Sequence, residues 1–385
     1  MKPWLAAARA VGIDVAARHA DEVDAGARFP AEAFAALKNE KLLGLLVPES
    51  EGGAGAGIAE VVAICHELGQ RCAATAMIYA MHQIQVSCIV RHAGSNAWLK
   101  AFLKRVAGEQ LLLASATSEA GVGGDVRSSI CAVEQQNGRF KLTKEATVIS
   151  YGADADGILV TARRTPHSPA SDQVIVVVPK SGYELEQESA WDTLGMRGTC
   201  SNGYQLKASG EMAQVVPVSY AEVSAMTMLP VSHLVWSALW LGIATDAVAR
   251  ARACVRAQAR KQGAAPANAG RLAEASSLLQ LMKANVVGSL RQYEAALGSE
   301  DEIASASFAV AMNNLKTGSS QMAVQVIHQC LLICGLAGYR NDSPYSLGRH
   351  LRDAHSAALM VNNDRILANT GTLLMALRED SGLLE

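Results

Sequence analysis

Three side chains in this sequence could accept a proton during a reaction. His82 lies in the stretch YAMHQIQ, and a histidine with a pKa near neutrality is chemically competent as a base. His233 precedes an apolar helical run that extends to Ile243, and Asp364 is followed directly by Arg365, whose charge can neutralise it. Abstraction of a proton beside a carbonyl requires such a base within contact distance. A structural hydrogen-bonding role is the alternative for each of these residues.

The sequence contains two glycine-rich segments, and the first of them could hold a ligand. The first, ATSEAGVGGDV, spans residues 116–126 and places Ser118 beside a glycine-rich turn. Such a turn lets backbone N–H groups approach a ligand closely and stabilise negative charge that develops on it. A β turn without any ligand is the alternative for this segment. The second is a glycine turn near the carboxy-terminal end, formed by Gly335, Gly338 and Tyr339.

Length and composition describe a large protein with a balanced surface charge. The chain has 385 residues, half of them apolar, which is enough for a large core and for two or three domains. With 34 basic and 36 acidic residues, nothing predicts a surface for nucleic acid. The longest apolar runs are interrupted by polar residues, and charged residues break any signal core near the amino terminus. We therefore expect no membrane span and a cytoplasmic location.

The eight cysteines are dispersed through the chain. Cys330 and Cys334 share a helix face if that stretch is helical, but no second ligand pair lies at the spacing of a zinc site. The pattern therefore predicts buried, reduced thiols and no metal site.

The pattern of apolar residues changes twice along the chain. Residues 1–110 have the spacing of core helices, and residues 219–385 return to it, with a periodic stretch from Leu272 to Tyr293. Between them, Asn137-Gly138 separates two alternating segments, as in a tight hairpin. The β-branched runs GILVTA (157–162) and QVIVVVP (173–179) predict strands. We expect a helical domain (1–110), a central β domain (111–218) and a helical bundle (219–385).

Four motifs in this order resemble the acyl-CoA dehydrogenase family over essentially the whole chain. They are FPAEAFAALKNEKLLGLLVPESEGGAG, ATSEAGVGGDV, TVISYGADADGILVTA and WDTLGMRGTCSNGYQL, followed by the glycine turn and the Arg352-Asp353-Ala354 helix. The resemblance implies a mostly α fold, with an N-terminal helical domain, a β-barrel-like middle domain and a C-terminal four-helix bundle. It also implies a homodimer or homotetramer, because a second subunit donates part of the cofactor site in the family.

The resemblance implies FAD as the cofactor and assigns residues to it. The implied cofactor-binding residues are Ser118, Ser150, Arg260, Gly335, Gly338 and Asn363. Gly124 takes the position of a serine that contacts the substrate, and Arg197, with Thr199 beside it, would line the mouth of the active site. Val148 stands where relatives carry a tryptophan that shields the flavin, so an aromatic surface is missing there.

The catalytic glutamate of the family is absent. Its usual position is Val361, and the alternative position in some relatives matches Ser232 or His233. The first interpretation is therefore α,β-dehydrogenation of an acyl thioester, with His82 as a relocated base. The acyl group would be carried by CoA or a carrier protein. The electron acceptor would be a protein such as an electron-transfer flavoprotein. The alternatives are a flavin-dependent oxidase or monooxygenase on the same fold, and a catalytically silent partner subunit.

Overall fold

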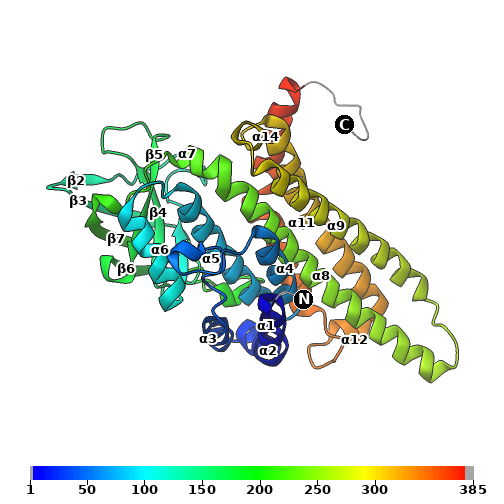
Figure 1. The fold of residues 1–385 in the computed structure, drawn as a ribbon. Coiled ribbons are helices and arrows are strands. Elements are labelled where there is room, and N and C mark those ends of the chain that lie inside the picture. Colours follow the sequence, from blue (N-terminus) through cyan, green and yellow to red (C-terminus); the bar gives the residue numbers. More distant parts are fainter. Residues whose placement is uncertain (1–2, 378–385) are drawn as a thin grey trace.

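The computed structural model describes residues 3–377 and begins with a layer of helices. These are α1 (Pro3–Val11), α2 (Ala17–Ala25), α3 (Ala31–Asn39), α4 (Ile58–Gly69), α5 (Ala73–His92) and α6 (Ala97–Glu109). Buried apolar side chains line α4 and α5, and α5 packs against both the first strand and the long helix α8 (Leu229–Gln262). The N-terminal layer therefore contacts both other parts of the molecule (Figure 1).

Two sheets form the middle of the chain. Their strands are β1 (Leu113–Ala116), β2 (Glu134–Gln136), β3 (Arg139–Ala146), β4 (Gly157–Arg163), β5 (Gln173–Pro179), β6 (Tyr183–Ser189) and β7 (Gly203–Glu211). One sheet has the order β1-β4-β5, with β1 parallel to β4, and the other has the antiparallel order β2-β3-β7-β6. The predicted hairpin is confirmed, because Asn137 and Gly138 join β2 to β3 with φ of 51° and 74°. The two predicted β-branched runs are β4 and β5.

Long helices make up the rest of the described chain. They are α7 (Tyr220–Val223), α8, α9 (Ala269–Ala296), α10 (Glu300–Ile303), α11 (Ala306–Cys334), α12 (Leu336–Tyr339), α13 (Gly348–His355) and α14 (Asn363–Ala376). Pro230 stands in the first turn of α8, and Gly263 ends the helix with φ of 73°. The helices α8, α9 and α11 pack against one another, and α14 packs against α11 (Figure 1).

The observed order of helical, β and helical parts agrees with the predicted fold class, while the exact domain limits stay a prediction. All eight cysteines are free, and seven of them are buried, as the sequence predicted. Two helical stretches, Ala73–His92 and Tyr220–Gln262, are long and apolar enough to cross a membrane. Their most apolar windows are 83% and 94% buried inside the protein, as in core helices.

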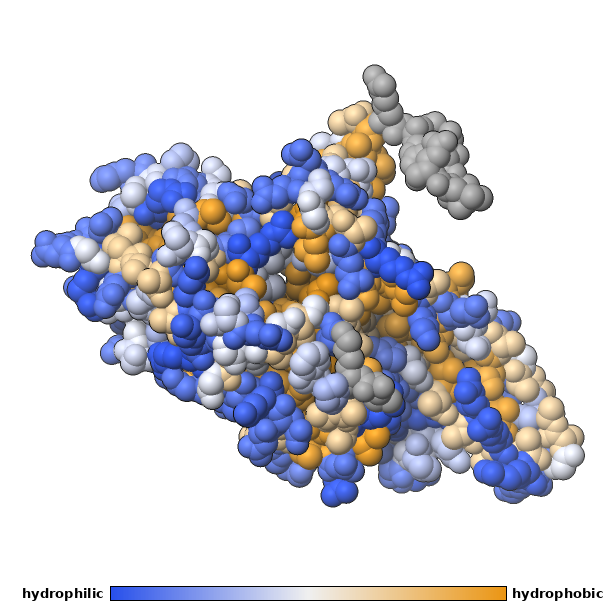
Figure 2. Space-filling model, viewed as in Figure 1, coloured by the Kyte–Doolittle hydropathy of each residue, from blue (hydrophilic) through white to orange (hydrophobic). Residues whose placement is uncertain are grey.

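Hydrophilic and hydrophobic residues are unevenly distributed on the face in Figure 2. Hydrophilic residues cover most of the region over the sheets, whereas hydrophobic residues come to the surface between this region and the long helices. Val148 on the β side and Val361 on the bundle side are both 37% exposed. The β part and the bundle therefore each contribute an exposed valine.

Candidate functional site at the junction of the β domain and the bundle

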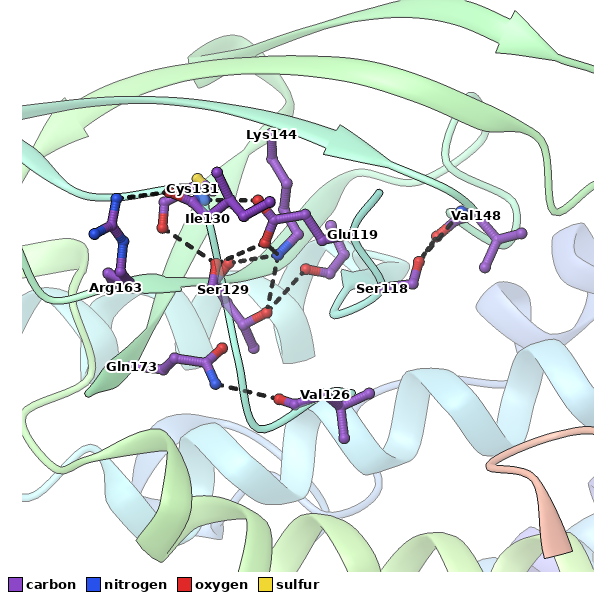
Figure 3. A network of polar contacts seen from close by, with 12 residues as sticks. Ser118, Glu119, Val126, Ser129, Ile130, Cys131, Lys144, Val148, Arg163 and Gln173 are labelled. Atoms are coloured by element: carbon purple, nitrogen blue, oxygen red, sulfur yellow. Dashed lines mark hydrogen bonds and ion pairs between the residues drawn. The ribbon is translucent and has the colours of Figure 1, made fainter. Parts of the chain in front are cut away.

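The segment after β1 is fixed to the second sheet through Ser118. The Ser118 hydroxyl donates to the carbonyl oxygen of Val148 over 2.9 Å and accepts from the Val148 N–H over 3.2 Å (Figure 3). One hydroxyl therefore satisfies both backbone groups of Val148. This contact places Ser118 next to the strand end that leads to Ser150.

A buried ion pair anchors the same segment more deeply. The Lys144 ammonium lies 3.1 Å from the Glu119 carboxylate, and the two side chains are 1% and 5% exposed (Figure 3). Glu119 also accepts from the Ser129 hydroxyl and the Cys131 N–H, each over 2.6 Å. Burial alone would raise the pKa of Glu119, but the Lys144 charge and these hydrogen bonds lower it overall. The carboxylate therefore holds the start and the end of the loop between β1 and β2.

Ser150 is the outer end of a chain of hydroxyl groups. Its Oγ lies 2.8 Å from Ser201 Oγ, which lies 2.8 Å from Thr199 Oγ1, and Thr199 donates to the Met196 carbonyl over 2.8 Å. Ser201 and Thr199 are buried, whereas Ser150 is half-buried. Because the Thr199 proton goes to Met196, Ser201 donates to Thr199 and Ser150 donates to Ser201, so Ser150 can only accept a hydrogen bond from a ligand.

The glycine-rich turn meets the bundle. Gly121, Gly123 and Gly124 have φ of 83°, 59° and 75°, a region that residues with a Cβ rarely occupy. The Arg365 guanidinium donates to the carbonyl oxygens of Gly123 and Gly124. A Cβ at Gly124 would lie 3.2 Å from that guanidinium, so a side chain there would crowd the contact. The first turn of α14 and the glycine-rich turn therefore meet directly.

The turn that precedes α14 contains a strained residue. Val361 has φ of 45°, which is a true outlier for a β-branched side chain. Lys316 of α11 donates to the Val361 carbonyl over 3.3 Å and to Asn363 Oδ1 over 2.7 Å, while Asn363 Nδ2 donates to Ser320 Oγ over 3.0 Å. We call residues 359–362 the Val361 turn. Lys316, Asn363 and Ser320 fix this turn against α11.

Replacement of Val361 by asparagine is expected to stabilise the protein by about 1 kcal/mol. The left-handed conformation costs an ordinary residue about 1–2 kcal/mol, and asparagine tolerates it better than valine. Urea unfolding of Val361→Asn would measure the gain. Val148→Asn is the matched control, because Val148 is equally exposed and lacks a positive φ. Equal effects of the two substitutions would contradict strain at Val361.

The structure contradicts the predicted role of His82 as a base. His82 on α5 has no exposed surface. Its Nε2 donates to the Leu43 carbonyl over 2.9 Å, and its Nδ1 accepts from the Leu113 N–H over 3.0 Å. Burial lowers the pKa of His82 to about 4. Neither ring nitrogen is available to a substrate, so the histidine has a structural role that links the N-terminal helices to β1.

Of the other candidate bases, Ser232 and His233 are buried inside the bundle, whereas Asp364 is exposed. Ser232 donates to the Leu229 carbonyl, and His233 donates from Nδ1 to the Met312 carbonyl over 3.0 Å inside the bundle. Asp364 is exposed at the start of α14, where its N–H is capped by Asn362. The side chain of Asn363 is used at both ends within the bundle, which contradicts a side-chain contact with a cofactor.

Arg197 contacts backbone carbonyls in the structure. Its guanidinium donates to the carbonyl oxygens of Asp24 and Thr193 over 2.8 and 3.1 Å. These bonds join the end of α2 to the segment before β7, so Arg197 has a structural role, and its contact with a substrate stays a prediction.

The predicted cofactor residues fall into two separated groups. Ser118 and Ser150 lie at the sheets, whereas Gly335 precedes α12 and Gly338 lies within it, beyond the middle of the bundle (Figure 1). Arg260 is exposed near the carboxyl end of α8, on the same distant side. One chain therefore does not bring the two groups together, and their cooperation stays a prediction that requires a second chain.

Lys316 and Ser201 belong to the candidate site but were not predicted from the sequence. Lys316 is fully buried, and its signal was a single charged residue within the apolar spacing of α11. Ser201 lies two residues after Thr199 in the predicted WDTLGMRGTCSNGYQL motif, but only the fold brings it to Ser150.

The residues on the β side of the junction fit a flavin. A half-buried hydroxyl that accepts a hydrogen bond suits a ring nitrogen that is protonated on reduction, and the glycines of the turn allow a ligand to approach the backbone closely. An added Cβ at Gly123 would meet open space, whereas Cβ atoms at Gly121 and Gly124 would meet Ile130 and Arg365, so the turn is open at Gly123.

Comparison with known proteins then decides the family. Residues 3–110 match "Acyl-CoA dehydrogenase, N-terminal domain", and residues 234–364 match "Acyl-CoA dehydrogenase, C-terminal domain". The chain belongs to the acyl-CoA dehydrogenase family. FAD is the standard cofactor within this family.

One curated protein and two solved structures illustrate what the chain is similar to. Cyclohex-1-ene-1-carbonyl-CoA dehydrogenase of Geobacter metallireducens is 30% identical over an alignment that covers 49% of this chain. The same alignment covers 51% of that relative, so this chain spans about half of the relative's length. Dibenzothiophene monooxygenase (TdsC) of Paenibacillus sp. A11-2 matches with a TM-score of 0.83 and 17% identity over 98% of both chains. Butyryl-CoA dehydrogenase of Megasphaera elsdenii matches with a TM-score of 0.78 and 20% identity over 97% of both. The two structural similarities establish the fold.

Proposed function

We propose that the protein is a flavin-dependent monooxygenase on the acyl-CoA dehydrogenase fold. The observation that carries this proposal is the lack of an available base among the described residues at the family's catalytic positions. Val361 cannot accept a proton, Ser232 is buried and bonded to backbone, and both nitrogens of His82 are occupied. His233 donates from Nδ1 to the Met312 carbonyl, and burial lowers its pKa to about 4, so its unpartnered Nε2 is a weak base. Oxygen transfer does not require a carboxylate that removes a proton from the α-carbon of a thioester, so this arrangement is compatible with it.

The proposed reaction balances with dioxygen as co-substrate. One oxygen atom enters the organic substrate and the other leaves as water, while the two electrons and two protons come from the reduced flavin, which an external reductant regenerates. The Ser150 hydroxyl, whose proton goes to Ser201, would accept a hydrogen bond from a protonated ring nitrogen. Ser118 and the glycine-rich turn would hold the edge of the ring.

Exposure at Val148 supports the same proposal. Val148 is 37% exposed at the position where relatives carry a shielding tryptophan. A smaller side chain covers less of a neighbouring ring, which leaves room for dioxygen to approach. A solved structure with a similar fold is named as a monooxygenase, which agrees with the proposal.

Reoxidation kinetics test the proposal directly. The purified protein, loaded with FAD or FMN, would be reduced anaerobically with dithionite and mixed with air-saturated buffer. We expect reoxidation within seconds, and peroxide release when substrate is absent. A reduced protein that stays stable in air, together with bleaching of the oxidised flavin by acyl-CoA thioesters, would refute the proposal.

The second candidate is α,β-dehydrogenation of an acyl thioester. It is favoured by the 30% identity to a named acyl-CoA dehydrogenase. It requires a base that is not yet identified and an acceptor such as an electron-transfer flavoprotein. Anaerobic bleaching by a panel of acyl-CoA and acyl-carrier-protein thioesters would favour it over the monooxygenase.

A further inference from the structure

The interior of the bundle contains a row of buried polar atoms without hydrogen-bond partners in the described chain. On α8 these atoms are His233 Nε2, Trp236 Nε1, Ser237 Oγ and Trp240 Nε1. The residues recur at steps of three, one and three, which places them on one face of the helix. All four residues are at most 7% exposed. A buried polar group without a partner costs about 1–3 kcal/mol, so four on one face require an explanation.

This face of α8 is turned toward α11. His233 Nδ1 donates to the Met312 carbonyl of α11 over 3.0 Å, and the Lys316 ammonium lies 5.9 Å from the centre of the Trp240 ring. Ser319, one turn after Lys316, has a buried hydroxyl that also lacks a partner. We call the six residues His233, Trp236, Ser237, Trp240, Lys316 and Ser319 the α8–α11 seam.

Lys316 brings an unneutralised charge into the seam. Its side chain has no exposed surface, and none of the ion pairs found among residues 3–377 includes it. Its two hydrogen-bond acceptors, Val361 O and Asn363 Oδ1, are neutral. A buried charge without a counter-charge is expensive, and the ring face of Trp240 compensates for only part of it. A water molecule would satisfy an N–H group, but it would not neutralise the ammonium.

We propose that the α8–α11 seam is a binding site for a small anion with the chemistry of a carboxylate. The ammonium of Lys316 supplies the charge, and the indole N–H groups of Trp236 and Trp240 and the hydroxyls of Ser237 and Ser319 supply neutral donors. A carboxylate offers about four acceptor positions for these donors. The proposal goes beyond the monooxygenase activity, because it involves neither the flavin nor the β side of the junction.

The charge state of Lys316 makes the site sensitive to pH. Burial lowers the pKa of Lys316 to about 8, so the amine is mostly protonated at pH 7 and mostly neutral at pH 10. The other titratable seam residue is His233, whose pKa burial lowers to about 4, so it stays neutral in this range. Anion binding is therefore expected at pH 7 and lost at pH 10.

Thermal unfolding of the full chain with formate or acetate tests the site. Sodium formate, sodium acetate or sodium chloride would be added from 0 to about 50 mM, with ionic strength balanced by the bulkier gluconate. At pH 7 we expect formate or acetate to raise the unfolding midpoint by at least about 2 °C, and tryptophan emission to change with the same concentration dependence. At pH 10 the shift should disappear.

Two matched lysine variants distinguish anion binding at the α8–α11 seam from a general effect of salt on stability. Lys316→Met should abolish the shift, whereas Lys283→Met, which removes an exposed lysine of α9, should keep it. Should Lys316→Met fail to fold, the comparison of pH 7 with pH 10 in the unchanged protein still decides. An equal shift at both pH values or in Lys316→Met, or no shift with either formate or acetate at pH 7, would overturn the proposal.

Discussion

Acidification from pH 7 to pH 4 is expected to remove about 10 kcal/mol of stability from this protein, through three buried histidines. Burial lowers the pKa of His82, His92 and His233 to about 4 in the folded chain, against an ordinary value of 6.5. Between these two pH values the unfolded chain binds more protons than the folded chain. Stability is therefore fully present above pH 6.5 and is lost progressively as the pH falls toward 4.

The pH dependence of urea unfolding measures this effect. With three protons taken up, the free energy of unfolding should fall with a maximum slope of about 4 kcal/mol per pH unit. His92→Gln, which removes the contact of His92 with Thr227, should reduce the maximum slope by about one third. His167→Gln, at an exposed loop position, is the control and should leave the slope unchanged. Equal stability at pH 7 and pH 5 would contradict the prediction.

Replacement of Lys144 by methionine is expected to lower the free energy of unfolding by about 3–5 kcal/mol. The substitution would leave the Glu119 carboxylate buried, with hydrogen bonds from Ser129 and Cys131 but no counter-charge. A buried charge without its partner is far more costly than the intact pair is stabilising. Because Glu119 fixes the loop that begins at Ser118, flavin affinity should fall together with stability.

Two further variants distinguish the effect of the missing Lys144 charge on stability from the effect of changed packing. Lys141→Met changes an exposed lysine on the same strand β3 and should cost less than about 0.5 kcal/mol. The double variant Glu119→Gln/Lys144→Met removes both charges and should recover part of the loss. Urea unfolding of all three would test the ion pair. Equal costs for Lys144→Met and Lys141→Met would show that the buried pair is not the cause.

The parts of the fold that depend on local pattern could be predicted from the sequence. Asn137-Gly138 encodes a hairpin because both residues tolerate positive φ, and the β-branched runs encode β4 and β5 through their fit to a buried sheet. The parallel pairing of β1 with β4 could not be predicted in this way. It joins segments that are separated by more than forty residues and depends on packing against α5.

The site was less predictable, because its contacts join residues that are distant in the chain. His82 was a plausible base by residue type, but its partners are backbone atoms 39 and 31 residues away. Lys316 reaches Asn363 across 47 residues. No local pattern reports such contacts, whereas Val361 could be recognised because it stands at a fixed offset from the Arg352-Asp353-Ala354 helix.

The length of α8 has a consequence for any assembly of this chain. A helix of 34 residues is about 50 Å long, and it separates the sheet-side residues from Arg260 at its far end. If both groups serve one cofactor, each cofactor is held by two chains, and each chain contributes to two cofactors. A substitution at Gly335 would then impair the cofactor site at the neighbouring chain's sheets rather than the cofactor site at the sheets of the same chain. Mixed assemblies of a Gly335 variant and a Ser150 variant would contain some cofactor sites built only from unchanged residues. The two variants would therefore complement each other.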